Sequence, residues 1–208
     1  MSARTSFGMA ITAFGAILCA VQPASAHLVS TELGPFYDGA AHPLVTPDDL
    51  LTILGLAALA AFGGPASGRR LLVALVVGWS VGLVLAFGLA HREWQAPIAT
   101  ACTLLVLGVA TLLKVPVPTL LLVAVGAVIG LARGALNGSA ARMADGQWLS
   151  IVGIAAGVFA LTCMSAALGV VLEKRGWSIA LRVGGSWIAA IGLLLLGWQL
   201  RTMLVPAG

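Results

Sequence analysis

Charged residues are what this sequence most conspicuously lacks. Only 9% of its 208 residues are Asp, Glu, Lys or Arg, whereas 60% are hydrophobic, and the mean hydropathy is +1.07. A soluble domain of this length needs a polar surface that so few charged side chains cannot cover. The composition therefore excludes a water-soluble globular protein and indicates an integral membrane protein.

Disulfide and catalytic patterns are also missing. Cys19, Cys102 and Cys163 lie far apart and form neither a CxxC pair nor a disulfide framework. No HExxH, GxSxG or glycine-rich phosphate loop occurs, so we expect no enzyme activity. The net charge of +4 is scattered between apolar runs rather than gathered on one face, so we expect no nucleic-acid partner.

The first 26 residues resemble an export signal. Arg4 supplies a positive charge, "FGMAITAFGAILCA" an apolar core and "QPASA" a small-residue cleavage site. Cleavage would leave His27 as the new amino terminus, on the extracytoplasmic side of a bacterial inner membrane. The alternative is an uncleaved first transmembrane helix, although the apolar core is shorter than the ~20 residues that a span needs. We expect a signal peptide at 1–26 and a single transmembrane domain at 27–208.

The mature chain contains six apolar runs that predict membrane spans. Each is long enough, or nearly so, to cross about 30 Å of hydrocarbon as a helix. Lipid offers no partners for backbone amides, and the alternating pattern of barrel strands is missing, so the spans must be helical. The sequence therefore predicts an all-α polytopic helical membrane bundle of about six transmembrane helices, at roughly 48–64, 71–90, 96–113, 118–134, 148–172 and 180–203.

Basic residues and tryptophans agree with an exported amino terminus. In that orientation six basic residues lie on the cytoplasmic side, and four lie outside or within the spans. Cytoplasmic loops usually carry more Lys and Arg than exported ones, so this modest excess agrees with the orientation. The six are Arg69, Arg70, Lys114, Lys174, Arg175 and Arg182, and the four are Arg92, Arg133, Arg142 and Arg201. Trp94, Trp148 and Trp177 stand at predicted span ends, where an amphipathic ring favours the interface.

Glycines recur at every fourth position in two of the predicted spans. The first set is Gly126, Gly130, Gly134 and Gly138, and the second is Gly153 and Gly157. Residues four apart share a helix face, so these stripes let a neighbouring backbone approach closely. Plain packing is the favoured interpretation. The contacts could lie within one bundle or between copies, which leaves a homo-oligomer open.

Arg133 stands inside the first glycine-striped span. An arginine in such a segment is costly unless it faces protein, water or a carboxylate. The alternative is that its side chain extends to the outer membrane surface.

The stretch "AHPLVTPDDLLTIL" carries two acids directly before an apolar run. One interpretation is a helix start, with Thr46 as the N-cap and Pro47 as the first helical residue. Asp48 and Asp49 would then complement the helix dipole, and Thr46 and Asp49 would form a capping box.

A helix start does not explain His42, which lies six positions before Asp48. It also leaves Glu32 and Asp38 unexplained, on the short exported segment that precedes this stretch. Imidazole and carboxylate groups at the outer mouth of a helical bundle can form a first binding site for a divalent cation. Both interpretations stay open at this point.

This stretch resembles a motif of the HupE/UreJ family of hydrogenase and urease accessory membrane proteins, regarded as nickel/cobalt permeases. That motif is close to H-P-x-x-G-x-D-H and opens the first mature span. Here His42, Pro43 and Asp48 match it, Thr46 replaces the glycine, and Asp49 stands in place of the second histidine.

A second family motif, H-G-x-x-H-G, appears here as "RGALNG". Gly134 and Gly138 are kept, whereas Arg133 and Asn137 occupy the histidine positions. The resemblance implies a nickel- or cobalt-type permease, with His42 and Asp48 as entry ligands and Asp49 and Asn137 as secondary oxygen ligands. It implies no resident cofactor, since the ion is the transported or bound species.

The departures from the family motifs change the expected chemistry. A carboxylate at position 49 favours harder ions than imidazole does, such as magnesium, manganese or weakly held cobalt. Arg133 places a fixed positive charge on the path of a cation. We therefore predict that Arg133 pairs with Asp48 or Asp49 through a charge-assisted hydrogen bond that joins the first and fourth spans.

A second function of a different class is a non-transporting accessory protein that binds copper or nickel. The freed amino group and imidazole of His27 offer two nitrogens from one residue, a combination that suits copper(II), and His42 could add a third. Under either hypothesis the partners are a divalent metal ion and the lipid bilayer.

Overall fold

The computed structural model describes residues 31–88, 97–141 and 146–204, and the regular structure in these ranges is entirely helical. This confirms the all-α class. The signal peptide expected at 1–26, and with it His27, lies outside the described residues. The helices are α2 (Pro35–Val45), α3 (Pro47–Phe62), α4 (Gly64–Gly88), α5 (Pro97–Leu112), α6 (Thr119–Ala141), α7 (Gln147–Lys174) and α8 (Ser178–Leu204).

The helices agree with a membrane protein, but fewer than six qualify as spans. Within the described ranges, α4, α6, α7 and α8 are each long and apolar enough to cross a bilayer. Helices α2 and α3 qualify only together, as a pair bent by 66° that forms either a broken span or a re-entrant loop. Helix α5 is apolar but only 16 residues long. Length and composition therefore support four spans, or five with the bent pair.

Helix α2 is a feature that the sequence analysis did not predict. Residues 35–45 were expected in a short exported segment, yet they form a helix packed on α7. The reason lies in small residues on both helices. A side chain on Gly153 or Gly157 of α7 would overlap the backbone carbonyls of Phe36 and Ala40, and one on Gly39 would overlap that of Ser150. The two backbones lie too close for anything larger.

The first glycine stripe packs α6 against α4. A side chain on Gly130 or Gly134 would collide with the backbone of α4 at Leu75 or Trp79, and one on Gly138 would collide with Leu83. Both stripes thus make contacts within one bundle, as the packing interpretation predicted.

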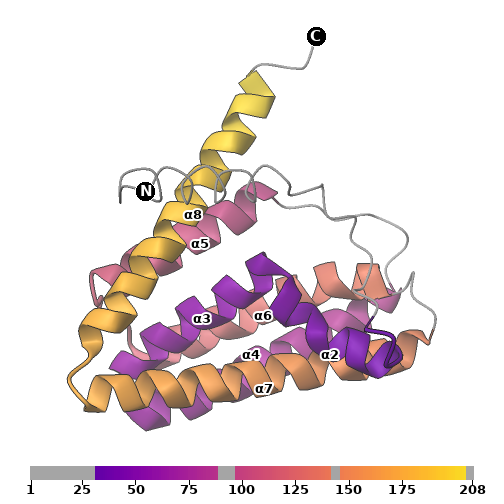
Figure 1. Cartoon of the computed structure of the whole chain (residues 1–208), viewed down its shortest axis with the longest axis horizontal. Helices are drawn as coiled ribbons and strands as arrows, with labels where there is room; N and C mark the ends of the chain where they lie inside the picture. Colours follow the sequence, from indigo (N-terminus) through magenta and orange to yellow (C-terminus); the bar gives the residue numbers. More distant parts are fainter. Residues whose placement is uncertain (1–30, 89–96, 142–145, 205–208) are drawn as a thin grey trace, which may run out of the picture.

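Helix α3 lies at the centre and contacts every other described helix. Ten of its sixteen residues are buried, and Ile53 and Leu56 form the core together with Trp79 of α4 and Ile154 of α7. In Figure 1, α5 and α8 lie side by side and extend away from the layer that contains α2, α3, α4, α6 and α7. A polar group on α3 is therefore within reach of several helices at once.

Candidate functional site at the break between α2 and α3

The break between α2 and α3 consists of one extended residue, Thr46, followed by a proline. Thr46 has φ −94° and ψ 102°, and Pro47 begins α3 directly after it. Proline disfavours the helical region for the residue before it, so the chain bends at Thr46. The break places His42 in the last turn of α2, and Asp48 and Asp49 in the first turn of α3.

Thr46 is the N-cap residue and Pro47 the first residue of α3, as predicted, but the capping box is wrong. The Thr46 side chain makes no cap hydrogen bond, and its Oγ1 lies 3.4 Å from Nε2 of His42 instead. The Asp49 carboxylate is directed away from the backbone of its own helix, because groups on α6 bind both of its oxygens.

Asp49 is fully buried and is the centre of the site. Its Oδ1 accepts a hydrogen bond from Nε of Arg133, at 2.6 Å, and forms an ion pair with Nη2 of the same guanidinium. Its Oδ2 accepts one from Nδ2 of Asn137, at 2.8 Å. The ion pair expected between Arg133 and an aspartate is therefore present, and its partner is Asp49. It joins α3 to α6.

Arg133 is buried, with 8% of its surface exposed, and α6 continues for two further turns to Ala141. Its side chain points into the protein, so extension to the membrane surface is ruled out. Nη1 donates to Oγ1 of Thr100, at 3.2 Å, which ties in α5 as well. Sequence reasoning missed Thr100, whose only signal is a hydroxyl in the apolar run of α5.

Asp48 is the more accessible of the two acids. Its side chain is 43% exposed, and its Oδ2 lies 4.0 Å from Nη1 of Arg133. Its backbone carbonyl accepts a hydrogen bond from the Thr52 hydroxyl at 2.6 Å. The Asp48 carboxylate is thus partly exposed at the protein surface, whereas the Asp49 carboxylate is fully buried.

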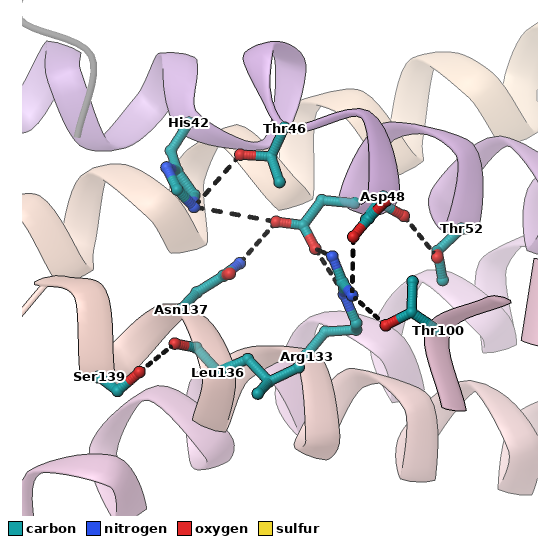
Figure 2. A network of polar contacts seen from close by, with 10 residues as sticks. His42, Thr46, Asp48, Thr52, Thr100, Arg133, Leu136, Asn137 and Ser139 are labelled. Carbon is teal, nitrogen blue, oxygen red and sulfur yellow. Dashed lines mark hydrogen bonds and ion pairs between the residues drawn. The ribbon is translucent and has the colours of Figure 1, made fainter. Parts of the chain in front are cut away.

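His42 faces the free side of Asp49. Its Nε2 lies 3.9 Å from Oδ2 of Asp49, too far for a direct hydrogen bond, and the residue is buried. In Figure 2, His42 on α2, Asp48 on α3 and the side chains of Asn137 and Arg133 on α6 point toward a common centre. The structure therefore brings together five of the six residues singled out in the sequence.

The charges and lone pairs of this cluster limit what it can bind. Arg133 binds Asp49 Oδ1 through a hydrogen bond and an ion pair, whereas Oδ2 accepts one hydrogen bond, from Asn137, and also faces His42. Two carboxylates against one guanidinium leave a net charge of −1 when His42 is neutral. No group of three or more His, Cys, Asp or Glu side chains suited to a metal exists in the part of the chain that the structure describes.

Glu32 and Asp38 do not join the cluster. Oδ1 of Asp38 accepts hydrogen bonds from the backbone N–H and the hydroxyl of Thr31, at 2.5 and 2.6 Å, and so fixes the entry to α2. Glu32 is exposed and has a φ of 61°. The outer-mouth cluster expected from the sequence is thus confined to His42, Asp48 and Asp49.

Comparison with known proteins gives one match. The family model described as HupE / UreJ protein matches residues 15–195, which is most of the chain. No curated protein and no solved structure matches. The matched region contains the α2/α3 break and the polar segment of α6, so the cluster lies where the two altered motifs meet. The chain belongs to the HupE/UreJ family.

Proposed function

We propose that the protein is a nickel- or cobalt-type divalent metal permease of the bacterial inner membrane, whose ion enters at the α2/α3 break. The bent helix pair, with His42, Asp48 and Asp49 beside the bend, is the observation that supports transport. Broken helices at membrane depth are tolerated where they line a cavity, and they commonly form the ion sites of transporters. In this proposal the mature amino terminus is extracytoplasmic.

The gap between His42 and Asp49 is the proposed binding position. A divalent ion bound at about 2.0–2.2 Å from each ligand atom can bridge an imidazole nitrogen and a carboxylate oxygen. Those two atoms are 3.9 Å apart here, close to what such a bridge needs. One nitrogen and otherwise oxygen ligands suit borderline ions held weakly, and weak binding favours release.

Arg133 is the counter-cation of this site. An arriving ion competes with the guanidinium for Asp49, and the guanidinium has alternative partners in Asp48, at 4.0 Å, and Thr100, at 3.2 Å. The accessible Asp48 attracts the ion from outside, and Asp49 receives it as Arg133 shifts. Return of Arg133 to Asp49 then favours departure of the ion.

Uptake of radioactive nickel or cobalt by cells that express the chain tests this proposal. We expect His42→Ala and Asp48→Ala to lower uptake by about tenfold or more, in the range seen when groups around a bound metal are lost. Asp38→Asn is the matched control, since Asp38 is an acid on α2 whose partner is Thr31. Equal uptake by the wild type and both alanine variants, at equal protein levels, would end the permease proposal.

The occupation of Asp49 by Arg133 favours a second candidate, a non-transporting accessory protein that binds copper or nickel. In this candidate the buried pair fixes the bundle, and the metal is held by the exported amino terminus at His27. Amino-terminal sequencing of the mature protein tests it. The expected first residue is His27, and any other residue there eliminates the arrangement.

A further inference from the structure

An apolar groove runs along the outer face of α4 and α6. Its volume is about 1010 Å³. The small residues Ala74, Gly78 and Ala127 line it, beside larger ones such as Val77 and Val128. The groove is separate from the polar cluster at the α2/α3 break, and it does not depend on the proposed transport.

Two arginines lie toward one end of the groove. Arg69 and Arg70 line it near the start of α4, and both are exposed. Neither makes an ion pair within the described ranges, and no acidic side chain lines the groove. The amino-terminal end of α6, at Thr119, lies at the same end of the groove and adds its positive dipole. This end therefore attracts an anion that no described part of the chain supplies.

The part of the groove beyond the two arginines matches one leaflet of a bilayer in length. Along α4 the lining residues run from Ala66 to Val81, and the part from Arg70 to Val81, which is eleven steps of about 1.5 Å, corresponds to about 16 Å of helix. Half of a hydrocarbon core of about 30 Å is about 15 Å. An acyl chain whose headgroup lies at Arg69 and Arg70 would reach the groove's far end near the bilayer midplane.

We infer that this groove binds one acyl chain of an anionic phospholipid, with Arg69 and Arg70 contacting the headgroup phosphate. Basic side chains at the end of an apolar interhelical groove are suited to such lipids, because the arginines attract the anionic headgroup while the groove buries the acyl chain of the same molecule. The described acids argue against a second copy of the chain. Glu173 binds Lys114, at 2.6 Å, and the other acids in the described ranges lie on α2, its preceding segment or the first turn of α3, so no described acid is placed to meet these arginines.

Native mass spectrometry of the purified full chain tests the inference. Phosphatidylglycerol and phosphatidylcholine with identical acyl chains are titrated into the detergent-solubilised protein. We expect phosphatidylglycerol to bind more tightly than phosphatidylcholine to the wild type. Arg69→Gln/Arg70→Gln should weaken its binding by about 25-fold, given a contribution of about fivefold from each basic side chain near a lipid surface. Lys174→Gln/Arg175→Gln removes the same charge from exposed residues outside the groove and serves as the matched control. It should change binding less than about twofold.

A second variant tests the acyl part of the site. Ala74→Leu fills the groove and keeps both arginines, so we expect it to weaken binding of both lipids. Equal affinity for the two lipids in the wild type would overturn the inference, as would equal losses in the arginine variant and its control. Unchanged lipid binding in Ala74→Leu together with loss of a dimer would instead identify a second copy as the occupant.

Discussion

Replacement of Arg133 by leucine is expected to lower the free energy of unfolding by about 3–5 kcal/mol, the usual cost of removing one partner of a buried ion pair. Asp49 would keep its charge at 0% exposure with only Asn137 bound to its carboxylate. Chemical denaturation in detergent micelles, followed by circular dichroism, measures the change. Arg201→Leu, in the exposed last turn of α8, is the control and should stay within about 0.5 kcal/mol of the wild type.

The double variant Asp49→Asn/Arg133→Leu separates charge from packing. Removing both charges should recover most of the lost stability, because neutral replacements of a buried pair cost little compared with an unpaired charge. A double variant as unstable as Arg133→Leu alone would mean that the guanidinium acts through its volume. In that case the pair would not be what joins α3 to α6.

Gly134→Val is expected to cost about 3 kcal/mol or more, the upper end of the range for overpacking. A Cβ on Gly134 would overlap the carbonyl oxygen of Trp79 and approach its carbonyl carbon and Leu83 N. These obstacles are backbone atoms of α4, so no side-chain rotation can relieve the clash, and the two helices must separate. The same denaturation experiment measures the loss.

Gly184→Ala is the matched control for this substitution. Gly184 also lies inside a membrane-length helix, but a Cβ there meets no atom within 4 Å. Alanine should therefore be neutral or stabilising by up to about 1 kcal/mol, the difference in helix propensity. Equal losses in Gly134→Val and Gly184→Ala would show that the close approach of α4 and α6 contributes nothing to stability.

Composition predicted much of the fold because lipid restricts the choices. With 60% hydrophobic residues the chain had to be a membrane protein, and lipid then required helices. Helix α2 was missed because its sequence, with Asp38, two prolines and a short length, has the features of a loop. Its stability depends on Gly39 meeting Ser150 of α7, a contact distant in sequence that no local pattern reveals.

The polar cluster was predicted in part. A charged side chain in an apolar span costs free energy in any fold unless it is paired, so Arg133 required a partner. That argument correctly paired Arg133 with an aspartate. It could not choose between Asp48 and Asp49, because adjacent residues on a helix point in different directions and only packing decides which one is buried. The capping box failed for the same reason, since Arg133 and Asn137 bind Asp49 more effectively than a backbone amide would.

X-ray absorption at the nickel edge, on purified protein without a histidine tag, most directly tests whether a divalent cation binds between His42 and Asp49. The proposed site predicts a nitrogen and oxygen shell that includes scattering from one imidazole. His42→Ala should remove that imidazole contribution, while Asp38→Asn should keep it. An imidazole signal that persists unchanged in His42→Ala, or a wild-type protein that holds no nickel, would contradict the account.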